Sequence, residues 1–166
     1  MTPEPLTLFS RLRGVAERRG DAPALVDRGR VYGYRRLLDA IEGLAGQVAA
    51  LRWEPPGRFA LVCPNGADFV IAFFAILRGG GIVVPLNPAL SEPELTALLG
   101  DAQVSKVITT GPLRDQAAAA LRSGCGQTKR RAHRGHRKIE NIPFVNEKRA
   151  TSSPQTMHGA FARVSI

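Results

Sequence analysis

Residues 77–88 read LRGGGIVVPLNP, and this stretch decides the fold. A helix end at Leu77 and Arg78 is followed by three glycines, a short apolar strand and a Pro-Leu-Asn-Pro exit. Phosphate-binding loops follow a strand and precede a helix, so that helix amides face the anion. Here the order is reversed, and the glycines predict a helix stop and a tight hinge.

The segment from residue 58 onward predicts alternating strands and helices. Apolar runs predict strands over 58–63, 82–84 and 104–109, and the helices expected between and after them are 67–78, 91–99 and 113–122. Asn65 is expected to cap the first of these helices. Ser91 and Glu94 have the spacing of a capping box, and Gly100 is expected to end the helix that they open. Short connections in this order predict a parallel sheet.

The first 57 residues predict two helices around a hairpin. Periodic apolar residues indicate a helix over 6–19, with Thr7 as its N-cap and Gly20 as its stop. Residues 24–26 and 31–32 flank a glycine-containing turn and predict a hairpin. A second helix carries one apolar face, made of Leu37, Ile41, Leu44, Val48 and Leu51. The predicted fold class is α/β: the N-terminal part of a three-layer αβα domain with a mostly parallel sheet, a small leading hairpin and a disordered basic tail.

Charge divides the chain into two predicted parts, 1–121 and 122–166. The first part holds 13 Lys/Arg and 12 Asp/Glu, and the second holds 10 Lys/Arg and 2 Asp/Glu. Leucine occurs 17 times in the first part and is absent from the second. The second part therefore predicts a tail of low order, unrelated to the domain before it. A shifted reading frame, a fused foreign segment or an alternative terminus would each produce such a step.

The residues alone assign no catalytic, cofactor-binding or metal site. All three histidines lie after residue 121. Cys125, His133 and His136 match no zinc spacing and stand among six Lys/Arg that repel a cation. Cys63 has no histidine near it in sequence and is predicted to be a core residue. The basic run Lys129–Lys138 lacks aromatic residues for base stacking, so it favours solvated chain over nucleic-acid binding.

Composition also bears on the compartment. Two cysteines make no disulfide framework, and the N-terminus has no long apolar region after a basic start. The longest apolar run, 69–77, is too short to span a bilayer. These features predict a reducing, cytoplasmic setting without a membrane span.

Residues from about 6 to 121 resemble the beginning of the AMP-forming acyl-CoA synthetase and adenylation-domain superfamily. Five segments match in order and spacing: DAPALV at 21–26, GYRRL at 33–37, RFALVCPNG at 58–66, LRGGGIVVPLN at 77–87 and LSEPELTALLGDAQVSKVITT at 90–110. The chain departs from the family pattern at Arg36, where Glu is usual, and at Gly79, where Ala is usual. The Pro-Leu-Asn-Pro exit is closer to fatty-acyl or aryl CoA ligases than to amino-acid adenylation domains.

The resemblance implies a two-step reaction. A carboxylate attacks the α-phosphate of ATP, with Mg²⁺, and CoA then takes the acyl group; a fatty or aryl acid is the implied substrate. The parts that do this are a Ser/Thr/Gly-rich loop ending in Pro-Lys, the adenine- and ribose-contacting motifs and the lysine of a C-terminal lid. None of them has a counterpart here. The resemblance therefore carries over no catalytic residue, and ATP, Mg²⁺ and CoA are not expected to bind this chain tightly.

The reading favoured by the sequence is an N-terminal fragment of an acyl-CoA synthetase, inactive by itself. Three alternatives remain. The chain is a fragment of an amino-acid or aryl-acid adenylation domain, or a non-enzymatic module that binds nucleic acid or an acidic partner through its basic tail. A truncated protein of marginal stability, with an unpaired sheet edge, is the last.

Overall fold

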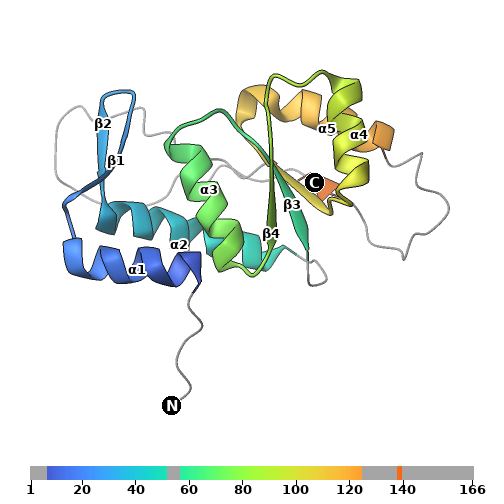
Figure 1. The fold of residues 1–166 in the computed structure, drawn as a ribbon. Coiled ribbons are helices and arrows are strands. Elements are labelled where there is room, and N and C mark those ends of the chain that lie inside the picture. The colour runs from blue at the N-terminus through green and yellow to red at the C-terminus, as the bar shows by residue number, and fades with distance from the viewer. Residues whose placement is uncertain (1–6, 52–56, 125–137, 140–166) are drawn as a thin grey trace, which may run out of the picture.

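The computed structural model describes residues 7–51, 57–124 and 138–139, which form three layers with a sheet in the middle (Figure 1). The helices are α1 (Leu8–Arg19), α2 (Tyr34–Ala50), α3 (Ala67–Arg78), α4 (Glu92–Asp101) and α5 (Arg114–Gly124), with a 3₁₀ turn at Gly111–Leu113. The strands are β1 (Pro23–Asp27), β2 (Arg30–Gly33), β3 (Arg58–Val62), β4 (Ile82–Leu86), β5 (Lys106–Thr109) and β6 (Lys138–Ile139). The predicted α/β class is confirmed.

The main sheet has the order β4-β3-β5-β6, and every neighbouring pair is parallel. Its central strand β3 pairs with β4 from Arg58 opposite Ile82 and with β5 from Phe59 opposite Lys106. Such a strand is covered on both faces, which explains why residues 59–62 are all buried and read as one apolar run.

Alternation along β3 divides the core between two helical layers. Phe59 and Leu61 face α1, α2 and α3, whereas Ala60 and Val62 face α4 and α5. The first layer is rich in aromatic side chains, since Phe69, Phe73 and Phe74 pack against its edge. The second layer is built from smaller residues, and α5 contributes Ala117 and Ala120 to it. Buried alanines let a helix lie close to the sheet, so the two layers differ in how they are filled.

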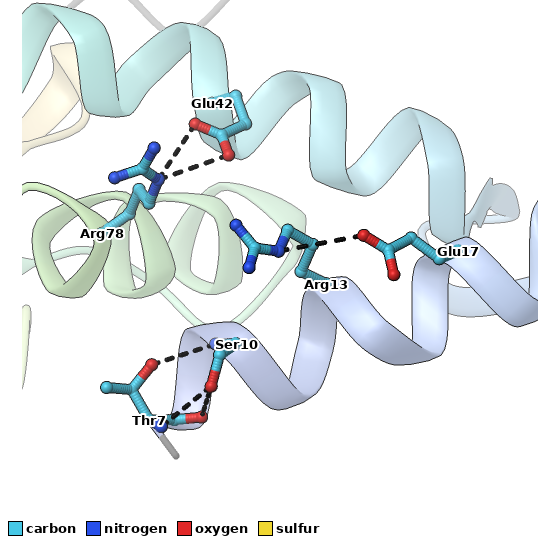
Figure 2. Close-up of polar contacts among 6 residues, drawn as sticks. All are labelled: Thr7, Ser10, Arg13, Glu17, Glu42 and Arg78. Atoms are coloured by element: carbon cyan, nitrogen blue, oxygen red, sulfur yellow. Dashed lines mark hydrogen bonds and ion pairs between the residues drawn. The ribbon is translucent and has the colours of Figure 1, made fainter. Parts of the chain in front are cut away.

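Figure 2 shows polar contacts that cap α1 and a contact that joins α2 to α3. Thr7 caps α1 by accepting from the Ser10 amide at 3.0 Å, and Ser10 Oγ accepts from the Thr7 amide at 2.9 Å. Arg78, in the last turn of α3, donates through Nε to Oε1 of Glu42 on α2 at 3.3 Å and forms an ion pair with Oε2 at 3.2 Å. Its guanidinium also lies 5.3 Å from the Phe9 ring centroid on α1. Arg78 therefore ties α1, α2 and α3 together.

Three local predictions need correction. Asn65 does not cap α3: it is exposed, and the capping oxygen belongs to Asp27, forty residues earlier. Gly100 does not end α4, because the helix continues to Asp101 and Gln103 takes the left-handed conformation that stops it. The second strand runs further than 82–84, since Pro85 and Leu86 belong to β4. Proline is tolerated there because β4 is the outermost described strand on its side of the sheet.

Two residues of the segment predicted to be a tail, Lys138 and Ile139, pair in parallel with Lys106 and Val107 of β5. The helix α5 also extends past residue 121, to Gly124. The remainder of 125–166 lies outside the described residues. The boundary at 121/122 therefore stays a prediction.

Candidate functional site at the carboxyl edge of the sheet

Ligands of open parallel sheets bind outside the carboxyl ends of the strands. In this chain that edge is formed by residues 63–66 after β3, 87–91 after β4 and 110 after β5. The strands that precede them are neighbours in the sheet, so these three connections lie together. They form the carboxyl edge, and it is the candidate site among the described residues.

The connection after β3 receives the tip of the β1–β2 hairpin. Asp27 Oδ2 accepts a hydrogen bond from the Ala67 amide at 3.1 Å, and Ala67 is the first residue of α3. Gly66 makes room for this contact, because a Cβ atom built on it would lie 3.0 Å from Oδ2 of Asp27. A carboxylate at a helix N-terminus satisfies a free amide and the helix dipole together. The anion position of α3 is thus filled from within the chain.

Burial shifts the pKa values of two titratable groups beside this contact. Burial raises the pKa of Asp68, the nearby charge of Asp27 raises it further, and Arg28 lowers it. Burial, then the charge of Asp68, raises the pKa of the Cys63 thiol to about 11. Cys63 is therefore a protonated thiol at neutral pH, its Sγ donating to the Pro64 carbonyl at 3.4 Å. A nucleophilic role needs the thiolate, and this site disfavours it.

The other two connections are held by local hydrogen bonds. Asn87 Oδ1 accepts from the Ala89 amide at 2.9 Å, and Glu94 Oε2 accepts from the Ser91 amide at 2.9 Å. After β5, Thr109 Oγ1 donates to the Val62 carbonyl at 2.8 Å. These groups use their polar atoms to shape loops and to join strand ends.

Each helix that starts at the carboxyl edge carries acidic side chains in or against its first turn. They are Asp27 and Asp68 at α3, Glu92 and Glu94 at α4, and Asp115 at α5. Lys106 is buried at the amino end of β5, which is the opposite edge. Carboxylates stabilise helix N-termini, but they repel phosphate. The described residues of this edge therefore do not fit the phosphates of a nucleotide.

The sequence candidates fare differently in the structure. Cys63 is a free, buried core residue, as predicted. Gly79–Gly81 form the predicted helix stop rather than an anion loop, since Gly80 has a φ of 83° and the amides of all three glycines donate to carbonyls of α3. Cys125, His133 and His136 lie outside the described residues, and within those described no group of side chains could hold a metal ion.

Asp27 is the position at this edge that sequence reasoning missed. Its sequence neighbourhood predicts only a turn, and its partner Ala67 follows forty residues later. The available signal was the acid in an otherwise ordinary Asp-Arg-Gly turn, opposite a helix start without a capping side chain of its own. None of the helices in the described segments combines the length and apolar character needed to cross a membrane.

Comparison with known proteins relates this chain to a family. Residues 12–160 match the model of the family described as AMP-binding enzyme. The chain belongs to this family. It is 35% identical over 112 residues to a 4-hydroxybenzoate–CoA/benzoate–CoA ligase of Rhodopseudomonas palustris, covering 66% of this chain and 21% of that relative. A long-chain-fatty-acid–CoA ligase of Bacillus subtilis is 36% identical over 103 residues, which are 62% of this chain and 18% of that relative.

A solved structure supports the same fold. A putative long-chain-fatty-acid CoA ligase from Rhodopseudomonas palustris superposes with a TM-score of 0.65 at 25% identity, over 82% of this chain and 33% of that chain. The chain spans about a fifth of the length of the curated relatives it matches. The family match continues to residue 160 and so includes most of the segment that composition sets apart.

Proposed function

We propose that this chain supplies the N-terminal three-layer segment of an AMP-forming ligase that joins a fatty or aryl acid to CoA. The observation that carries the proposal is the family match over 12–160, together with two relatives named as CoA ligases of benzoate-type and long-chain acids. In such a ligase ATP, with Mg²⁺, activates the carboxylate and CoA accepts the acyl group. The described residues contribute shape to that enzyme rather than chemistry.

The contacts of the described residues support a scaffolding role. Arg78 joins three helices, Thr109 closes the end of β5 on β3, and Asp27 fixes the hairpin to α3. All three use their polar groups within the chain, and the acidic helix starts disfavour phosphate. We therefore expect the purified chain alone to lack adenylation activity, with the contacts to ATP and CoA made by other parts of a longer ligase.

Acid-dependent exchange between ATP and pyrophosphate tests the expected inactivity. The full chain is incubated with ATP, Mg²⁺ and labelled pyrophosphate, with benzoate, 4-hydroxybenzoate, a long-chain fatty acid or an amino acid in separate reactions. We expect exchange equal to the reaction without acid. Exchange that depends on one acid would overturn the expected inactivity and name the substrate class.

A chimera tests the lineage. Residues 7–124 replace the matching segment of a benzoate–CoA ligase, and formation of the acyl-CoA is measured. We expect activity to be retained in part, because strands and helices superpose. A matched pair of chimeras carries Gly81→Ala, which forces a Cβ within 2.7 Å of Phe59, or Gly46→Ala, where nothing lies within 4 Å. Loss with the first and retention with the second would show that the fold of this segment supports activity.

Only if the chain supports exchange does the same substrate panel separate CoA ligases from amino-acid adenylation domains, through the acid that the exchange requires. The structure does not separate these classes at Asn87, because its Oδ1 accepts from the Ala89 amide and an aspartate would accept equally well. The basic-tail binding module stays a prediction. Its run Lys129–Lys138 lies outside the described residues except for Lys138, and no described contact favours it over the ligase.

A further inference from the structure

The connection from β3 to α3 contains Asn65 and Gly66, the one place in the sequence where asparagine precedes glycine. Glycine has no Cβ to shield its backbone nitrogen, so an asparagine before it is especially prone to spontaneous deamidation. The sequence holds no aspartate before glycine, which would react in a related way. Asn87 precedes Pro88, whose nitrogen carries no hydrogen and cannot attack. The chemistry of the chain therefore singles out residue 65.

Asn65 is accessible for this reaction in the folded chain. It is exposed, and among the described residues no hydrogen bond engages its side-chain amide or the backbone amide of Gly66. Exposure admits the water that completes the reaction, and an unbonded backbone amide is free to move into position for attack. Asn87 differs here too, because its Oδ1 accepts from the Ala89 amide at 2.9 Å.

The fold retains the glycine that makes residue 65 reactive. A Cβ atom on residue 66 would lie 3.0 Å from Oδ2 of Asp27 and 3.4 Å from its Oδ1. A larger residue there would push this carboxylate away from the Ala67 amide, which it binds at 3.1 Å. The substitution that would slow the reaction is thus opposed by the contact that attaches the hairpin to α3. The reactive pair and the hairpin attachment depend on the same glycine.

We propose that Asn65 deamidates spontaneously in the folded chain, and that its isoaspartate form detaches the β1–β2 hairpin from α3. The backbone nitrogen of Gly66 loses its proton and bonds to Cγ of Asn65, the bond from Cγ to Nδ2 breaks, and ammonia leaves with that proton. One water then opens the cyclic imide, and no oxidant or reductant takes part. Opening at the main-chain carbonyl gives isoaspartate, whereas opening at Cγ gives aspartate.

Isoaspartate alters the start of α3 in two ways. The backbone now runs through Cβ and Cγ of residue 65, so it is longer by one carbon just before Gly66, and this shifts the Ala67 amide relative to Asp27 Oδ2. The product also carries a carboxylate beside Asp27 and Asp68, whose charges already disfavour each other. A hydrogen bond of 3.1 Å tolerates little displacement of its donor. The aspartate form adds the charge without the longer backbone and should loosen the hairpin less.

Ageing of the full chain tests the proposal. The protein is incubated at physiological temperature in neutral and in mildly alkaline buffer, then digested, mapped by mass spectrometry and labelled with an isoaspartate methyltransferase. We expect conversion at residue 65 ahead of every other asparagine, and faster in the alkaline buffer, because attack needs the deprotonated nitrogen of Gly66. In the isoaspartate fraction, hydrogen exchange of residues 23–33 should be about tenfold faster, as expected for loss of one capping bond.

Three variants sharpen the test. Asn65→Gln keeps an exposed amide before Gly66, but its longer side chain closes the imide far more slowly, so hairpin exchange should stay unchanged after ageing. Asn87→Gln is the matched control and should age at residue 65 like the parent chain. Asn65→Asp, measured before ageing, carries the charge alone, and we expect a smaller acceleration of hairpin exchange than isoaspartate causes.

Two results would overturn the proposal. Asn65 that stays intact through ageing of the folded chain excludes the modification, and conversion in urea alone would show that the fold protects the site. IsoAspartate at residue 65 with unchanged exchange of residues 23–33 would show that the hairpin attachment does not depend on this connection. Neither measurement uses ATP or CoA, so failure here leaves the proposed ligase function untouched.

Discussion

Helices α3 and α4 are built alike and stabilised differently. Each follows a strand of the parallel sheet, begins against a carboxylate and ends in a turn where two amides bond back to the last carbonyls. For α4 the carboxylate is Glu94, three residues after Ser91. For α3 it is Asp27, brought from the hairpin. The local cap forms wherever the helix forms, whereas the remote cap exists only when two distant segments have already met.

The helix ends show the same contrast. In α3, Gly80 takes the left-handed position and Gly81 bonds to the Ile76 carbonyl; in α4, Gln103 and Val104 take the equivalent places. This is the Schellman motif, which usually has glycine in the left-handed position. In α4 the residue that follows it is a buried valine packed in the second core, whereas in α3 that place is a glycine pressed against Phe59. One end contributes a side chain to the core, and the other leaves room for a ring.

The largest expected effect follows from that difference. Gly81→Ala places a Cβ 2.7 Å from the Phe59 ring and 2.9 Å from Ile76 Cγ2, in a buried position. We expect it to lower the free energy of unfolding by about 3 kcal/mol, because overpacking a core forces backbone and side chains apart. Urea denaturation measures the change. Gly46→Ala is the control: it is open to solvent inside α2 and should stabilise by roughly 0.5–1 kcal/mol. Equal effects of the two would refute the role given to Phe59.

The remote cap is the next test. Asp27→Ala removes the acceptor of the Ala67 amide and detaches the hairpin tip from α3, and we expect a loss of about 2 kcal/mol. Hydrogen exchange should accelerate both in 23–33 and in the first turn of α3. Ser91→Ala at α4 should accelerate exchange only near residue 91, because that box is local. If Asp27→Ala left the hairpin amides unchanged, the two caps would be equivalent and the contrast would fail.

These two caps also mark how far the sequence could predict the structure. Periodicity and capping patterns predict the order of elements from Leu8 to Thr109, because the signal for each element comes from residues that are close together in the sequence. The Ser91–Glu94 box was predicted for the same reason. The Asp27 cap was not, since neither Asp27 nor Ala67 identifies the other, and Asn65 offered a nearer but wrong candidate. The end of α4 was misplaced at Gly100 because Gln103 adopts a conformation that sequence patterns assign to glycine.

Substitutions at the two left-handed positions, Gly80 and Gln103, should change the free energy of unfolding in opposite directions and by about equal amounts. Gly80→Ala should destabilise by about 1 kcal/mol, since an L-residue there is strained at a φ of 83°. Gln103→Gly should stabilise by roughly 0.5–1 kcal/mol, because it relieves the same strain at a φ of 51°. Thermal unfolding of both variants beside the parent chain measures the signs. Destabilisation by Gln103→Gly would mean that the glutamine side chain contributes more than the strain costs, for which its contact with Arg58 Nη1 at 2.9 Å is the candidate.

The smallest expected effects concern the pH dependence of stability that the carboxylates in the first turns of α3 and α4 produce. At α3, burial and then the charge of Asp27 raise the pKa of Asp68, so its ionised form is disfavoured in the folded state. At α4, hydrogen bonds from the side chain and then the backbone of Ser91 lower the pKa of Glu94. Ionised Asp68 therefore lowers stability at neutral pH and this cost is relieved as pH falls through its raised pKa, whereas Glu94 adds stability above its unfolded pKa and loses it as pH falls through the lowered one.

The corresponding variants should move the melting temperature in opposite directions at pH 7. Asp68→Asn is expected to raise it and Glu94→Gln to lower it, and both differences should shrink in acid as the carboxyl groups of the parent chain protonate. The measurement is a set of melting curves of the two variants and the parent chain between pH 3 and pH 7. This interval of about 4 units contains the ordinary pKa values of aspartate and glutamate. A fall in melting temperature for Asp68→Asn would show that its favourable position in the first turn of α3 outweighs its burial beside Asp27, and the two helix starts would then obey one rule instead of two.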